Sequence, residues 1–159
     1  MTTLKTLKQL KTIRKNLNAE NKKVVFTNGC FDLIHAGHVD YLSKAKKMGD
    51  VLIVGLNSDS SVRSIKGNKR PILKEPERIF ILSNLKPVDY IVVFNEDTPE
   101  KLINELVPDI LVKGADWKLK DIVGKDIVLK NGGEVKTIEF VNDQSTTKII
   151  KTIVSRYKD

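Results

Sequence analysis

Short apolar runs alternate with helix-like segments along this chain of 159 residues, and the alternation constrains the fold more than any other feature. The run 51–56 is continuously apolar, as a strand must be when helices cover both faces of its sheet. The pattern therefore predicts a Rossmann-like α/β fold, an open parallel five-stranded sheet with right-handed crossovers and helices on both faces. The expected strands are 24–28, 51–57, 89–94, 110–114 and 134–140, and the expected helices are 36–48, 76–86, 98–107, 122–131 and 145–157.

An amphipathic N-terminal helix is expected over residues 1–22, followed by one domain over 23–159. Its apolar face consists of Leu4, Leu7, Leu10, Ile13 and Leu17. The formal net charge of +8 is concentrated there, because residues 1–23 hold seven Lys and Arg against one Glu. The remaining 136 residues hold 21 basic and 19 acidic side chains. We expect the apolar face to pack on the body or on a partner chain; membrane or RNA contact is the less favoured alternative.

The composition, with 40% hydrophobic and 30% charged residues, is typical of a soluble globular protein. No apolar stretch approaches the ~20 residues of a membrane-spanning helix, and the N-terminus lacks the hydrophobic segment of a signal peptide. Cys30 is the only cysteine, so an internal disulfide is excluded, which fits a reducing compartment. We therefore expect a cytoplasmic protein that contacts neither membrane nor nucleic acid.

The end of the first expected strand carries the clearest chemical signal. Residues 27–38 read Thr-Asn-Gly-Cys-Phe-Asp-Leu-Ile-His-Ala-Gly-His. His35 and His38 are three residues apart, so both rings can project from one face of the first turn of the next helix. The free N–H groups and the positive dipole end of that turn favour an anionic ligand. Gly37 would let such a ligand approach the backbone.

Other roles for the two histidines fit the sequence less well. They are the only histidines in the chain and fall together at a strand-to-helix junction, which argues against ordinary surface residues. A metal site with Asp32 lacks a further cysteine or histidine, and no nearby base supports a nucleophile. The favoured interpretation is electrostatic: imidazole and helix N–H groups donate to phosphoryl oxygens as charge builds up on them.

Polar residues follow the expected strands, and the carboxyl ends of parallel strands share one edge of the sheet. They lie at 28–32, 57–59, 113–116 and 142–147. The loop 63–71 is rich in cations, which predicts a mobile flap that brings Lys66, Lys69 or Arg70 to phosphates; a solvated surface loop is the alternative. The hydroxyls of 145–147 open the last helix, where they can cap it and bind an anion.

These motifs resemble the cytidylyltransferase-like nucleotidyltransferase superfamily over about residues 23–157. The resemblance rests on Gly29-Cys30-Phe31-Asp32 with His35-Ala36-Gly37-His38, and on Ser145-Thr146-Thr147 at the last helix. In that superfamily the two histidines contact the triphosphate and stabilise the transition state, and the Ser-Thr-Thr helix start helps to hold the β and γ phosphates. The resemblance implies the same roles for the matching residues here.

Further segments are similar to the adenylyltransferases that act on D-glycero-β-D-manno-heptose 1-phosphate and form ADP-heptose for lipopolysaccharide precursors. The segments are 57–59, 66–71, 96–99, 112–116 and 131–135. That activity is often fused behind a sugar kinase domain, and this chain resembles the stand-alone form. Trp117 and Lys148 instead resemble glycerol-3-phosphate cytidylyltransferases. Transfer of CMP from CTP to a polyol phosphate and a non-catalytic nucleotide-binding module both stay open as alternatives.

The heptose resemblance implies in-line transfer of AMP from ATP to a sugar 1-phosphate, with His35, His38 and Lys66 as catalytic residues. The expected nucleotide contacts are Asn28, Gly29, Cys30, Phe31, Gly37, Lys113, Gly114, Asp116, Ser145, Thr146 and Thr147. The expected acceptor contacts are Asp32, Asn57, Asp59, Lys69, Arg70 and Arg78. Mg²⁺ is expected as a cofactor held mainly by the ATP phosphates, with at most Asp32 from the protein. Asp32 has the alternative role of orienting its loop. The resemblance also implies a homodimer.

Overall fold

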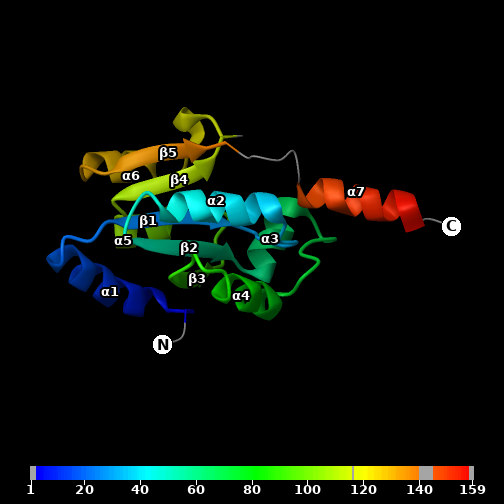
Figure 1. Cartoon of the computed structure of the whole chain (residues 1–159), viewed down its shortest axis with the longest axis horizontal. Coiled ribbons are helices and arrows are strands. Elements are labelled where there is room, and N and C mark those ends of the chain that lie inside the picture. The colour runs from blue at the N-terminus through cyan, green and yellow to red at the C-terminus, as the bar shows by residue number, and fades with distance from the viewer. Residues whose placement is uncertain (1–2, 116, 140–144, 158–159) are drawn as a thin grey trace.

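Five parallel strands form one sheet in the order β3-β2-β1-β4-β5 (Figure 1). The structure is a computed structural model that describes residues 3–115, 117–139 and 145–157. The strands are Val24–Gly29 (β1), Val51–Asn57 (β2), Tyr90–Phe94 (β3), Ile110–Gly114 (β4) and Glu134–Ile138 (β5). The predicted five-stranded parallel sheet is thereby confirmed, and most of the predicted strand ends are matched to within one residue.

Helices cover both faces of this sheet, as predicted. They are Leu7–Ala19 (α1), Ala36–Lys46 (α2), Asp59–Lys66 (α3), Glu75–Ser83 (α4), Glu100–Leu106 (α5), Lys125–Lys130 (α6) and Thr146–Tyr157 (α7). α2 and α4 pack on one face, where Leu42 and Leu82 are fully buried. α1, α5 and α6 pack on the other face, where Leu10, Ile103 and Val128 are fully buried. The strands supply both layers because successive side chains point to opposite faces.

One local prediction is wrong, and one predicted helix begins later than expected. The stretch 59–66, whose second half was expected to belong to a flap, forms helix α3. The hydroxyl of Ser58 accepts a hydrogen bond from the Ser61 N–H and caps this helix, and Val62 anchors it in the core. The helix expected over 122–131 is present as α6 but begins three residues later, after a 3₁₀ turn at Leu119–Asp121.

The N-terminal helix packs on the body, which is one of the two placements expected for its apolar face. Leu10 is fully buried, with Leu7, Ile13 and Leu17 around it. Leu4 lies before the helix and forms a parallel bridge with Ile91 on the edge strand β3. Among the helices of the described part of the chain, none is long and apolar enough to cross a membrane.

The strand order predicts where a ligand should bind. From central β1 the chain runs outward to β2 and β3, and then returns to β4 on the other side of β1. The connections after β1 and β4 therefore diverge, and a crevice opens at the carboxyl ends of these two strands. This is the edge at which the sequence places the histidine pair.

Candidate functional site

A cavity of about 480 Å³ opens at this switch point, within the ~300–1,000 Å³ of ordinary small-molecule sites. The ends of β1 and β4 form its floor, through Asn28 to Asp32 and Lys113. α2, α3 and α7 contribute His38, Lys66, Thr146 and Thr147 to its walls. One cavity thus gathers residues from every polar segment that the sequence placed on this edge.

The two histidines form a stacked pair at the first turn of α2. His35 is the N-cap residue, and its ring centroid lies 3.9 Å from that of His38 with an interplanar angle of 37°. Only His38 of the two lines the cavity. The His35 ring lies over Gly37, where an added Cβ would come within 3.1 Å of its Cε1 and Nδ1 atoms. The missing side chain of Gly37 therefore makes room for a ring as well as for a ligand.

Both imidazoles are neutral at physiological pH. Burial lowers the pKa of His38 to about 4, with a further contribution from the neighbouring His35, and burial also lowers the pKa of His35. The Nδ1 atoms of both rings are buried and have no hydrogen-bond partner among the described residues. A neutral imidazole can donate one N–H to a phosphoryl oxygen, so the pair supplies directed donors, whereas any positive charge must come from elsewhere.

Lysine and arginine side chains supply that charge. Lys66, the last residue of α3, and Arg70 of the following loop both line the cavity. Lys113 at the end of β4 donates to Asn28 Oδ1 at 2.5 Å, and its Nζ lies 5.3 Å from the Trp117 ring centroid. These three cations make the cavity suitable for a polyanionic ligand such as a triphosphate.

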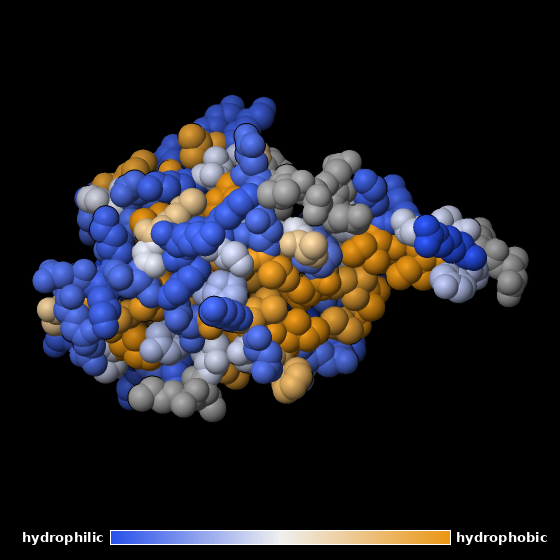
Figure 2. Space-filling view, in the orientation of Figure 1, coloured by the Kyte–Doolittle hydropathy of each residue, from blue (hydrophilic) through white to orange (hydrophobic). Residues whose placement is uncertain are grey.

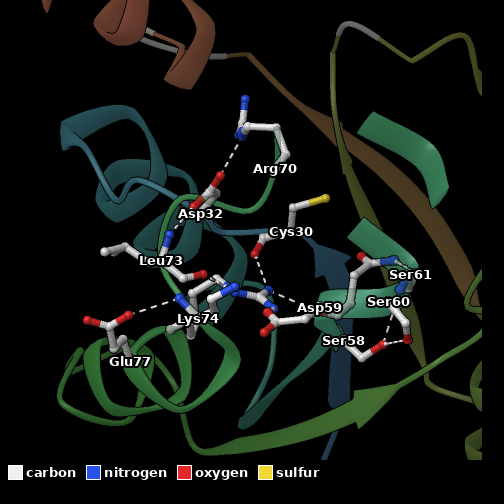
Figure 3. A network of polar contacts seen from close by, with 12 residues as sticks. Cys30, Asp32, Ser58, Asp59, Ser60, Ser61, Arg70, Leu73, Lys74 and Glu77 are labelled. Atoms are coloured by element: carbon white, nitrogen blue, oxygen red, sulfur yellow. Dashed lines mark hydrogen bonds and ion pairs between the residues drawn. The ribbon is translucent and has the colours of Figure 1, made fainter. Parts of the chain in front are cut away.

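Arg78 does not face the cavity, although the sequence pointed to it as a ligand of the acceptor phosphate. Its side chain is fully buried. The guanidinium donates to the carbonyl oxygens of Cys30, Asn57 and Leu73, and it pairs with Asp59 at 2.8 Å. Figure 3 shows the acceptor groups on Cys30, Leu73 and Asp59 converging on one point. With most of its N–H groups satisfied by the protein, Arg78 acts in the structure as a brace, and Asp59 is its counter-ion.

Asp32 also holds protein groups. Its carboxylate accepts hydrogen bonds from the backbone N–H groups of Ile72 and Leu73 and pairs with Arg70 Nε at 2.5 Å. These donors outweigh the effect of burial and lower the pKa of Asp32. The contacts correspond to the loop-orienting alternative for this residue. The described residues include no cluster of three His, Cys, Asp or Glu that would complete a metal site around it.

The last helix brings hydroxyls to the opposite wall. The Ser145 hydroxyl accepts from the Lys148 N–H and so caps α7, and Thr146 donates to the Leu33 carbonyl at 3.4 Å. Thr146 and Thr147 both line the cavity. Asp116 lies outside the described residues, as does the first part of 142–147.

The remaining predicted residues divide into two groups. Asn28, Gly29, Cys30, Phe31 and Asn57 line the cavity, and Gly114 lines a smaller adjoining pocket that shares several of these residues. Lys69 is exposed and does not line it. Five further residues line the cavity that were not expected as site residues: Ile65, Asp97, Thr98, Pro99 and Val123. Asp97 to Pro99 follow β3, so their position after a strand was the available signal; Ile65 and Val123 had none.

A model of the cytidylyltransferase-like family matches residues 26–152. The chain is 55% identical over 140 residues to "Bifunctional protein HldE" of Citrifermentans bemidjiense, which covers 88% of this chain and 29% of that protein. It is 53% identical over 154 residues to the protein of the same name from Geobacter metallireducens, and this match covers 97% of this chain and 31% of that protein. The chain thus spans about three tenths of the length of the curated relatives it matches.

Two crystal structures share the fold. The lipopolysaccharide core biosynthesis protein from Thermoplasma volcanium superposes with a TM-score of 0.62 at 33% identity, which covers 77% of this chain and 99% of that one. Pantoate-beta-alanine ligase from Francisella tularensis superposes with a TM-score of 0.61 at 16% identity, and the match covers 92% of this chain and 69% of that one. The second similarity is one of fold alone.

Proposed function

Because the chain belongs to the cytidylyltransferase-like family, we propose that it is a nucleotidyltransferase that moves AMP from ATP to D-glycero-β-D-manno-heptose 1-phosphate. ADP-heptose and pyrophosphate are the products. The observation that carries the reaction class is the stacked, neutral His35–His38 pair beside a cavity with cationic walls. The heptose acceptor is supported by the five similar sequence segments, by the HldE relatives and by the lipopolysaccharide core biosynthesis neighbour.

The reaction is an in-line displacement at the α-phosphorus of ATP. An oxygen of the sugar 1-phosphate forms the new P–O bond, and the bond to the pyrophosphate oxygen breaks with its electron pair leaving on pyrophosphate. The attacking phosphate is already anionic, so the site needs no strong general base. The protein contributes positioning and charge neutralisation, which are the main sources of rate in phosphoryl-type transfer.

The groups around the cavity divide this work. His38 and His35 donate N–H groups to phosphoryl oxygens, together with the free backbone N–H groups of the first turn of α2. Lys66 and Lys113 balance the charge of the triphosphate. The hydroxyls of Thr146 and Thr147, at the start of a second helix, hold the far phosphates. Two helix N-termini thus approach the phosphate chain from different sides.

Mg²⁺ accompanies ATP in this proposal and is held by phosphate oxygens and water. Asp32 is a poor ligand for it, because the carboxylate already accepts from Arg70, Ile72 and Leu73. The metal would add positive charge on the phosphate oxygens, and the assignments of the protein residues do not depend on it.

Transfer of CMP from CTP to glycerol 3-phosphate is the second candidate. Trp117 favours it, because it lines the cavity beside Lys113 in the segment that resembles glycerol-3-phosphate cytidylyltransferases. Pyrophosphate release, measured with ATP or CTP against heptose 1-phosphate or glycerol 3-phosphate, separates the two. We expect turnover with ATP and heptose 1-phosphate; turnover with CTP and glycerol 3-phosphate alone would replace the proposal by the second candidate. Nucleotide binding without pyrophosphate release from any pair would indicate a non-catalytic module.

We also propose a homodimer that covers α7. No residue of this helix is buried, and Ile153, Val154 and Tyr157 are 50%, 53% and 80% exposed. Figure 2 shows apolar surface that extends from the body of the molecule onto this helix. A helix of this length is only marginally stable in water when it does not pack against another surface. Light scattering of the wild type should give the mass of two chains, and Ile153→Lys should give one; a monomeric wild type would refute the dimer.

A further inference from the structure

Two arginines make the same kind of brace in different parts of this fold. Arg14 of α1 donates to the carbonyl oxygens of Leu106 and Val107 and pairs with Asp109 at 2.8 Å. Arg78 of α4 donates to three carbonyl oxygens and pairs with Asp59 at the same distance. Asp109 lies just before β4, whereas the acceptors of Arg78 include Asn57 at the carboxyl end of β2. Only the Arg78 brace therefore lies at the edge that carries the cavity.

A residue with a left-handed backbone lies at or directly after a carbonyl held by each brace. Val107 has a φ of 40°, and Phe31, which directly follows the carbonyl held by Arg78, has a φ of 44°. A bulky side chain rarely adopts this conformation and keeps it only when its surroundings fix it. Phe31 is fixed on both sides, because Arg78 Nη1 holds the Cys30 carbonyl at 2.7 Å and the Asp32 carboxylate accepts from the N–H groups of Ile72 and Leu73.

The left-handed turn determines where the Phe31 ring lies. The ring is 5% exposed, and its centroid lies 5.4 Å from that of His38 at an interplanar angle of 56°. On its other side it reaches Gly29, where an added Cβ would come within 3.0 Å of the ring. The ring therefore fills the space between the end of β1 and His38. Any change of the Phe31 backbone would move the ring and alter the packing of His38.

We propose that Arg78 is a positioning residue for the histidine pair: it holds the Cys30 carbonyl, which fixes the left-handed Phe31, whose ring sets the place of His38. A guanidinium is needed because its planar fork reaches several carbonyl oxygens and Asp59 together, whereas an ammonium binds as a point charge. The inference rests on the proposed function only for the role of His38 as a hydrogen-bond donor to phosphoryl oxygens. The chain of contacts from Arg78 to His38 is independent of the substrate.

The test compares Arg78→Lys with the matched variant Arg14→Lys, which loses the same kind of brace away from the cavity. The readouts are the urea midpoint, kcat and KM, and the titration of the two histidine Hε1 signals by NMR. We expect both variants to lose stability. Only Arg78→Lys should lower kcat, by about 100-fold as for a small misplacement of a catalytic group, with a smaller effect on KM. Only Arg78→Lys should move the pKa of His38 from about 4 toward its ordinary value, because the ring is less well covered.

Equal changes in the two variants, or an unchanged His38 titration in Arg78→Lys, would show that Arg78 only stabilises the fold. If Arg78→Lys does not fold, Phe31→Leu carries the test, because it keeps the brace and removes the aromatic ring. It should shift the His38 titration and lower kcat in the same directions; wild-type values for both would overturn the inference. The titration needs no substrate, so a wrong acceptor or a wrong nucleotide leaves this readout valid.

Discussion

Replacement of His38 by alanine tests the central claim about the site, that a neutral imidazole serves as a hydrogen-bond donor. Removal of one donor to an oxygen that gains charge in the transition state costs about 100- to 1,000-fold in kcat, or about 2.7–4 kcal/mol. The fold should survive, because the Nδ1 atom of the ring has no hydrogen-bond partner among the described residues. The expected result is a large loss of turnover in a protein that unfolds cooperatively.

The pH dependence of stability gives the same variant a second signature. The pKa of His38 is lowered to about 4 in the folded protein, so the folded state favours the neutral form relative to the unfolded chain. The resulting stabilisation is complete above the unfolded pKa of about 6.5 and is lost as the pH falls toward 4. With these two pKa values, the wild type loses about 2 kcal/mol from this group between pH 7 and pH 5. The alanine variant has no imidazole at position 38, so its free energy of unfolding does not contain this pH-dependent contribution.

Urea unfolding followed by circular dichroism at pH 7 and pH 5 measures the difference. The free energy of unfolding should fall less steeply in the variant, by up to about 2 kcal/mol over this range. Parallel pH profiles for the two proteins would refute the buried neutral state of His38, and unchanged kcat would refute its catalytic role.

Three further changes have separate expected outcomes. Gly37→Ala should favour the helix by about 1 kcal/mol yet lower kcat, because the new Cβ would lie 3.1 Å from the His35 ring. Thermal unfolding and turnover measure the two effects, and wild-type turnover would contradict the prediction. Lys66→Ala should raise KM for ATP. It should also slow alkylation of Cys30 by iodoacetamide, because the Lys66 charge opposes the burial that raises the pKa of this thiol; faster alkylation would contradict the assignment. Asp32→Asn should destabilise the fold by about 3–5 kcal/mol in urea, as for a broken buried ion pair, and a wild-type midpoint would contradict the loop-orienting role.

The fold was predictable from the sequence because its strands are buried on both faces. The run 51–56 is apolar without interruption, and all seven residues of β2 are buried in the structure. α3 was missed because its sequence is mostly polar and it buries only Ser61 and Val62. Ser58 followed by an acidic residue in the first turn was the available signal for its start. A short helix on a polar edge lacks the apolar stripe on which periodicity depends.

The site was predictable only in part, for a related reason. His35 and His38 are neighbours in sequence, so helix geometry alone brings them together. Arg78 looks like any cation in a first helical turn, and the groups that bury it include backbone carbonyls up to 48 residues away. Every residue has a backbone carbonyl, so the sequence does not indicate which carbonyls accept hydrogen bonds from Arg78. The same reason explains why Asp32 was expected to contact a ligand or a metal, although it accepts from the N–H groups of Ile72 and Leu73.

The arrangement of charges explains why a site for a polyanion uses histidines that are neutral. Lys66, Arg70 and Lys113 attract the triphosphate through their positive charge, whereas an imidazole N–H forms a directed hydrogen bond. His38 packs against the tilted rings of His35 and Phe31, and these contacts orient its N–H and bury the ring. Burial lowers the pKa, and the lost positive charge is supplied by the lysines across the cavity. Attraction and alignment are thus assigned to different residues, while the buried Arg78 and Asp32 hold the backbone around the histidine turn.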